Sequence, residues 1–193
     1  MQQVFKPIGN EYRISIPAPG SSEEGEPLLV VKQKKLAIKE DIRFRVNPDR
    51  DEHLFMIKSK SVFEFRGRHE VLAADGSTIG QLEKVFGASL LRSRWLVRGA
   101  DGAELVSGEE ASLAIALIRR FAGLIPVAGA ELLTYLPFNF RLTSPSGEDV
   151  GHYHRVLGKF RDRYVLELGP AAAGIDRRLL VAFAVALDAL QDR

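Results

Sequence analysis

Residues 175–190 read Ile-Asp-Arg-Arg-Leu-Leu-Val-Ala-Phe-Ala-Val-Ala-Leu-Asp-Ala-Leu, and the run from Leu179 to Leu187 is apolar without interruption. The alanines and long aliphatic residues favour a helix, and Asp176 can cap its first turn. A helix that is apolar on every side has to be buried in a protein core or in a bilayer. The uncharged part is only about half of the ~20 residues that a bilayer span needs. The stretch therefore predicts a helix in the core of a folded domain.

The composition is that of an ordinary soluble domain. The chain has 193 residues, of which 46% are hydrophobic and 27% are charged, and this suits one domain, or one domain plus a tail. It contains no cysteine, so disulfides, thiolate catalysis and zinc–sulfur sites are excluded. The formal net charge of +2 is too small to indicate a nucleic-acid partner. The first seven residues lack the apolar region of a secretion signal, so we expect a cytoplasmic protein.

Much of the chain alternates apolar and polar residues with a period of two. Such alternation predicts strands with one buried and one solvated face, which is typical of antiparallel sheets. The clearest examples are Ile42–Val46, Phe63–Phe65, Phe138–Leu142 and Leu166–Leu168.

Turn signals recur between these strands. Residues 74–77 and 100–103 each contain Asp-Gly, residues 145–148 contain Ser-Gly, and residues 47–50 resemble a longer copy. Glycine at such places supports the positive φ angles of tight hairpin turns. The pattern predicts about a dozen strands, more than a small sheet holds without closing or splitting.

Two segments depart from this pattern. Residues 1–27 contain one short alternating run, Tyr12–Ile16, followed by the polar linker Pro17–Pro27, so we expect a peripheral N-terminal segment before a domain of residues 28–193. Glu109–Ala122 begins with acids and ends with arginines before Gly123, which predicts a helix. We interpret the segment 109–136 as an insertion that covers one end of the sheet.

The fold class predicted from these features is mainly β with a buried helix. Eight strands close into a barrel that its own side chains fill, whereas more strands leave room for contents. Ile175–Leu190 is the helix without a polar face. We therefore expect a closed antiparallel barrel of about twelve strands around this C-terminal helix, plus one inserted helix.

These features resemble the LURP-one-related family, which belongs to the tubby C-terminal-like superfamily and is related to the phospholipid scramblases. The resemblance covers about Leu28–Leu190, and its clearest parts are Asp75-Gly76, Asp101-Gly102 and the helix Ile175–Leu190. It implies a twelve-stranded, tubby-like barrel around a hydrophobic C-terminal helix. The inserted segment 109–136 departs from the plant members of the family.

For function, the resemblance implies lipid binding, because tubby domains bind phosphoinositides and scramblases are associated with calcium and lipid movement. Residues 49–52, Asp-Arg-Asp-Glu, are interrupted by an arginine and lack the glycine of a calcium loop. No residue of the tubby lipid site can be placed on this sequence. LURP-one-related proteins mostly lack a defined biochemical activity.

The densest basic region contains the candidate ligand-binding residues Lys32, Lys34 and Lys35. Residues 28–70 hold eleven Lys and Arg against seven Asp and Glu, a local excess of four positive charges. This region can be a phosphate or membrane-surface patch. The alternative is the solvated face of two strands, where lysines discourage edge pairing. Arg161 and Arg163 are further candidates, as an anion site or as part of a hairpin turn.

His152 and His154 share one face of a predicted strand and could hold a metal, but zinc needs three or four ligands. We expect exposed histidines and no metal or cofactor. No phosphate loop or Gly-x-Ser-x-Gly elbow occurs, so no catalytic set emerges.

We therefore expect a monomeric, non-enzymatic binding module for anionic phospholipid or phosphoinositide headgroups, peripheral at the membrane. The alternative is a structural or protein-interaction module whose partner docks on the inserted helix region. A small-ligand carrier is a third reading, which a lumen filled by the helix disfavours.

Overall fold

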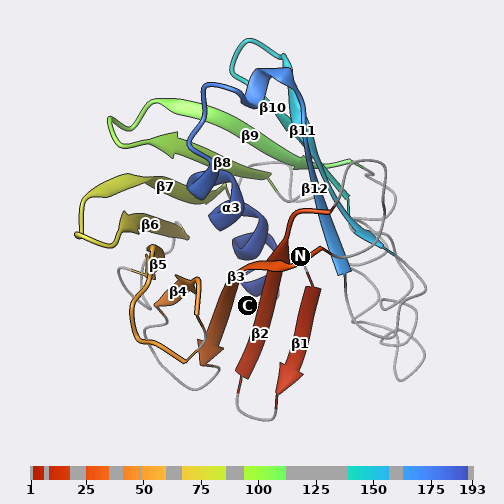
Figure 1. Ribbon diagram of the computed structural model, residues 1–193. Coiled ribbons are helices and arrows are strands. Elements are labelled where there is room, and N and C mark those ends of the chain that lie inside the picture. The colour runs from red at the N-terminus through yellow and green to blue at the C-terminus, as the bar shows by residue number, and fades with distance from the viewer. Residues whose placement is uncertain are drawn as a thin grey trace, which may run out of the picture.

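The computed structural model describes residues 2–6, 9–17, 25–34, 41–47, 49–59, 67–85, 94–111, 139–156 and 163–190. These residues form a series of antiparallel strands followed by a C-terminal helix (Figure 1). The strands are β1 (Gln2–Lys6), β2 (Gly9–Ser15), β3 (Pro27–Lys34), β4 (Ile42–Arg45), β5 (Phe55–Ser59), β6 (Arg68–Ala73), β7 (Thr78–Val85), β8 (Arg94–Gly99), β9 (Glu104–Glu110), β10 (Asn139–Thr143), β11 (Asp149–Val156) and β12 (Arg163–Leu168). A short 3-10 turn, Pro170–Ala172, leads from β12 to the helix α3 (Arg177–Ala189).

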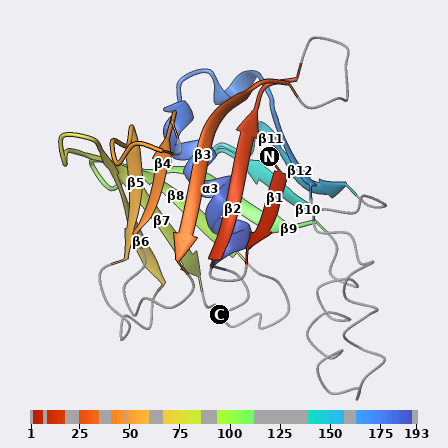
Figure 2. The same cartoon turned by 60° about the horizontal axis from the view of Figure 1, so that its bottom comes forward.

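Each strand pairs antiparallel with its neighbours in the sequence, so that the sheet curves around α3 (Figures 1 and 2). β1 pairs with β2 over five register positions, but it meets β12 at one, Gln2 opposite Arg163. The predicted fold class, mainly antiparallel β with a C-terminal helix, is confirmed. Closure of the sheet depends on the single pair between β1 and β12.

The helix α3 forms the centre of the core, as its sequence predicts. Asp176 caps it, because a carboxylate oxygen accepts the Arg178 backbone N–H at 2.8 Å. Leu179, Leu180 and every residue from Ala182 to Leu187 are buried. Strand residues such as Phe44, Trp95 and Leu142 are fully buried around it. Each large apolar side chain removed from water contributes about 1.5–3 kcal/mol, so this packing dominates the stability of the fold.

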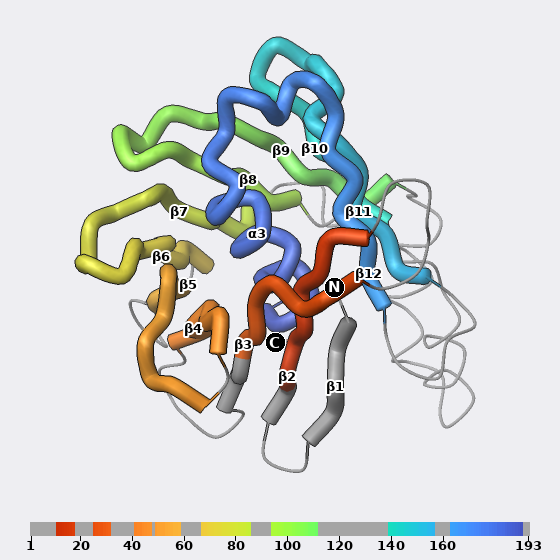
Figure 3. Tube along the Cα trace, in the orientation of Figure 1, coloured from red at the N-terminus to blue at the C-terminus, as the bar shows by residue number. Residues whose placement is uncertain are grey.

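Three predicted hairpin turns are confirmed at one end of the sheet. They connect β6 to β7, β8 to β9 and β10 to β11, and their glycines, Gly76, Gly102 and Gly147, have φ angles of 85°, 83° and 86°. Asp75 accepts the backbone N–H of Ser77 at 2.9 Å, and Asp101 accepts that of Ala103 at 3.0 Å. α3 begins at the same end, because it follows the last residues of β12 through the short turn (Figure 3).

The N-terminal segment differs from the sequence-based expectation. β1 and β2 are strands of the sheet rather than a peripheral segment, and Tyr12 of β2 is fully buried in the core. Pairing with β3 over seven register positions holds β2 in place. Residues 18–24 of the predicted linker lie outside the described residues, and the domain boundary at residue 28 stays a prediction.

The predicted start of the inserted helix at Glu109 is wrong. Glu109 and Glu110 belong to β9, where they lie opposite Arg141 and Phe140 of β10. Strand pairing with a distant segment overrides the helical preference of the local sequence. Residues 112–138 lie outside the described residues, as does the predicted strand Phe63–Phe65. Within the described ranges, no helix is long and apolar enough to span a bilayer.

Candidate functional site

A row of basic residues lies on the outer face of β1 to β4. Tyr12, Val31 and Phe44 are buried in the core, and because side chains alternate along a strand, the residues between them occupy the outer face. On these four strands the outer positions carry six basic residues and one acidic residue, Glu11. We call this surface the cationic face; its basic residues are Lys6, Arg13, Lys32, Lys34, Arg43 and Arg45.

The strand register sets like charges next to one another. Lys32 lies opposite Glu11 of β2 on one side and opposite Arg43 of β4 on the other. Like charges directly opposite each other in a sheet destabilise the pairing. Among the described ion pairs on this surface, Arg13 Nε lies 3.4 Å from Glu11 Oε1 and Arg45 Nη2 lies 3.4 Å from Asp51 Oδ1. Because six basic residues face one acidic residue on these strands, the cationic face keeps an excess of positive charge.

The neighbouring part of the sheet shows the opposite arrangement. On β7, Glu83 is paired at 3.0 Å with Arg68 of β6 and at 3.1 Å with Arg98 of β8. Burial raises the pKa of Glu83, but the hydrogen bonds and charges of the two arginines outweigh it and hold that pKa below its usual value. Glu83 therefore lies between two arginines and compensates part of their charge.

The residues predicted to bind a ligand are only partly brought together. Lys32 and Lys34 are alternate residues of β3 on the cationic face, whereas Lys35 and Arg161 lie outside the described residues. Arg163 begins β12 opposite Gln2, whose other partner is Arg13 of β2. This pairing places Arg163 at the edge of the cationic face. Lys6 and Arg13 are not among the predicted ligand-binding residues, because the sequence predicts a peripheral segment there.

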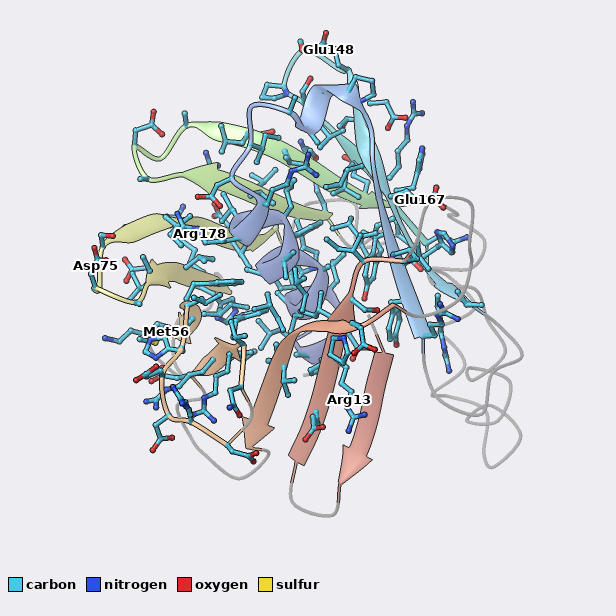
Figure 4. All side chains as sticks on the ribbon, in the orientation of Figure 1. Arg13, Met56, Asp75, Glu148, Glu167 and Arg178 are labelled. Carbon is cyan, nitrogen blue, oxygen red and sulfur yellow. The ribbon has the colours of Figure 1, made fainter. Side chains whose placement is uncertain are left out.

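A cavity of about 380 Å³ lies at the other end of β2 and β3, beside α3. Its lining is mainly apolar and includes Leu29, Leu166 and Val181, with Arg177 at the start of the helix. The neighbouring Arg178 forms an ion pair with Asp176 at 2.7 Å, at the N-terminal end of α3 (Figure 4). This pair holds the pKa of Asp176 below its usual value. No local sequence pattern marks the cavity, because strands from both ends of the chain line it.

The family model described as LURP-one-related matches residues 28–188, which is most of the chain. The chain belongs to the LURP-one-related family. The resemblance predicted from the sequence is thereby confirmed. Searches of curated proteins and of solved structures found no match.

The two histidines considered as metal ligands, His152 and His154, lie on β11. This strand is not part of the cationic face, and neither histidine lines the cavity. His152 is exposed on β11, with Nε2 3.3 Å from Asp149 Oδ2, and His154 is half-buried two residues further. In the described part of the chain, no group of three or more metal-ligating side chains comes together.

Proposed function

We propose that this LURP-one-related protein is a non-enzymatic binding module for anionic phospholipid headgroups, and that the cationic face is its binding surface. The observation that carries the proposal is the excess of six basic residues over one acidic residue on four adjacent strands. Each basic residue near an anionic membrane contributes about 1 kcal/mol, and the contributions fall off within a Debye length. On this proposal the protein is cytoplasmic, monomeric and peripheral at the membrane.

A headgroup with several phosphates, such as that of a phosphoinositide, suits the spacing of these residues. Lys32 and Lys34 are two residues apart on one strand, which corresponds to about 6.6 Å. Lys32 and Arg43 are opposite each other on neighbouring strands, which lie about 4.8 Å apart. Positive charges this close repel one another, and Glu11 opposite Lys32 offsets only one of them. A polyphosphorylated headgroup therefore relieves repulsion that a single phosphate relieves only in part.

Cosedimentation with phosphoinositide-containing vesicles tests the proposal. We expect the wild-type protein to pellet with vesicles at low salt and to dissociate as salt rises. Lys32→Glu with Lys34→Glu should weaken binding by well over tenfold. Its melting temperature has to be measured as well, because a carboxylate at position 32 lies opposite Glu11. A matched control is Lys58→Glu with Arg141→Glu, because these residues lie on β5 and β10, outside the cationic face, and also lie opposite glutamates, Glu70 and Glu109. A wild type that fails to pellet at low salt would contradict the proposal, as would equal loss in both variants.

A protein-interaction module is the second candidate function, favoured by apolar side chains exposed next to β4 and β5. Val46 is 63% exposed and Leu54 is 49% exposed. The backbone N–H of Leu54 donates to the carbonyl oxygen of Phe44 at 2.9 Å. Leu54 therefore lies beside β4, and Val46 directly follows the end of that strand. This candidate is favoured if the wild type captures one specific protein and has no affinity for vesicles. Val46→Ser with Leu54→Ser should then abolish that capture. Most of the inserted segment 109–136, on which a partner was expected to dock, lies outside the described residues.

We also infer that the sheet closes into a tubby-like barrel of twelve strands. The pair of Gln2 with Arg163 supports the closure. A closed barrel leaves no sheet edge open to pairing with other chains, which is the usual advantage of closure. Closure also joins Arg163 to the cationic face.

A further inference from the structure

The cavity beside α3 lies between one stripe of the helix and the ends of three strands. Arg177, Val181 and Ala184 are spaced by four and three residues and so form the helical wall. The opposite walls come from Ile14 at the end of β2 and from Leu168 at the end of β12. Leu28 and Leu29 of β3, Tyr153 of β11, and Ser15, Ile16 and Leu166 complete the lining.

The cavity lies where β2 and β12 extend beyond their pairing with β1. β1 begins at Gln2, which lies opposite Arg13 of β2 and Arg163 of β12. β2 and β12 continue beyond these residues toward the N-terminal end of α3. Within the described ranges no strand lies between the two continuing segments. Ile14 of β2 and Leu166 and Leu168 of β12 line the cavity together with residues of α3.

The lining combines an apolar wall with one cationic group. Arg177 is exposed at the border of the cavity, and in the described part of the chain it has no ion-pair partner. Its neighbour Arg178 is bound to Asp176 and does not line the cavity. Two apolar residues of the lining, Ile16 and Leu28, are 68% and 52% exposed. An apolar path thus leads from solvent into the cavity beside a guanidinium group that can bind a carboxylate with two parallel hydrogen bonds.

We propose that this cavity binds a single-chain carboxylate of medium length, with its hydrocarbon tail against Val181 and Leu166 and its carboxylate at Arg177. The volume of about 380 Å³ is at the lower end of the range of ~300–1,000 Å³ for small-molecule sites. It accommodates one flexible chain but not the two chains of a phospholipid. The site is at the opposite end of the strands from Lys32 and Lys34, so it does not depend on the cationic face.

Calorimetric titration with sodium decanoate below its micelle concentration tests the inference. We expect binding of one decanoate per chain, with an affinity that rises about fourfold per methylene from hexanoate to decanoate. Decanol should bind at least about tenfold more weakly, and decyltrimethylammonium more weakly still, because neither can pair with Arg177. Absence of decanoate binding, or equal affinities for decanoate and decanol, would overturn the proposal.

Two variants locate the site. Arg177→Gln should weaken decanoate binding at least about tenfold and leave decanol unaffected, whereas the matched control Arg178→Gln should bind decanoate like the wild type. Val181→Phe fills the cavity and should abolish binding of both ligands, and its melting temperature shows whether it folds. Equal effects of the two arginine variants would place the ligand elsewhere. The Lys32→Glu, Lys34→Glu protein should bind decanoate with wild-type affinity, so the two proposed sites are tested independently.

Discussion

At the scale of single residues, the contact between Gly108 and Phe183 shows how closely the sheet approaches α3. A β-carbon on Gly108 would lie 2.6 Å from Cζ of the Phe183 ring. Real β-carbons do not approach other atoms so closely, so a larger residue forces the helix or the strand to move. The aromatic ring of α3 therefore requires glycine on the facing strand, β9.

Gly108→Ala should lower the free energy of unfolding by about 1–3 kcal/mol, because overpacking a rigid core is costly. Phe183→Leu should be less harmful in the Gly108→Ala protein than in the wild type, since the ring is the group that clashes. Denaturant titrations of the four proteins measure this coupling. Gly76→Ala is the control, because its cost comes from a φ of 85° with no atom within 4 Å, and it should show no coupling with Phe183→Leu.

His69 gives the stability a dependence on pH. Burial lowers the pKa of His69 from 6.5 to about 4. Between these values the unfolded chain binds a proton that the folded protein does not, so the free energy of unfolding falls as pH falls, by about 1 kcal/mol per unit. Above pH 6.5 and below about pH 4, His69 should not make the free energy of unfolding depend on pH. Denaturant titrations from pH 7 to 4 should show a shallower slope for His69→Gln, and an unchanged slope would contradict the assignment.

At the scale of elements, α3 shares one hydrophobic core with buried residues of β2 to β12. Phe183→Ala should cost about 3–5 kcal/mol, as expected for removal of a buried aromatic ring. Phe183→Asp and deletion of residues 174–193 should leave an aggregating protein with weak amide protection, because an unpaired charge or an empty core replaces the helix. Thermal melts and hydrogen exchange measure these effects. A truncated protein that stays soluble with full-length stability would rule out a core role for α3.

The elements that the sequence predicts best are those whose signal is local. The helix at 177–189 is apolar on all sides from Leu179 to Leu187, and the turns at Gly76 and Gly102 require glycine at a positive φ. Glu109 and Glu110 were mistaken for the start of a helix, because acids suit a first turn and their strand partners, Arg141 and Phe140, are distant in the chain. Long-range pairing decides such segments, and a single sequence does not reveal it.

At the scale of the whole molecule, the pair between Gln2 and Arg163 determines whether the sheet is a barrel. Gln2→Cys with Arg163→Cys should form a disulfide, because opposite residues of antiparallel strands are 4.5–5.5 Å apart at Cα, roughly the usual span. The chain has no other cysteine. The cross-link should raise the free energy of unfolding by about 2–4 kcal/mol in oxidising buffer and lose this effect in reductant. Failure to oxidise would argue against closure.

The candidate sites are also properties of the whole molecule. The lysines of β3 were visible in the sequence, but the addition of Lys6 and Arg13 depends on strand register. The cavity is lined by residues of β2, β3, β11, β12 and α3, and no local pattern encodes how these elements come together. Composition and motifs therefore indicate which residue types are candidates for a site, whereas strand pairing decides which of them lie together.

The position of α3 after all the strands affects how the protein is made. A ribosome synthesises every strand of the sheet before it adds Leu179 to Leu187, on which the inner faces of those strands pack. Until then the growing chain carries residues such as Phe44 and Trp95 without their final neighbours. Contacts between segments so distant in the chain form slowly, and apolar surface left open in the meantime favours aggregation. We expect the nascent chain to need a chaperone until the helix emerges.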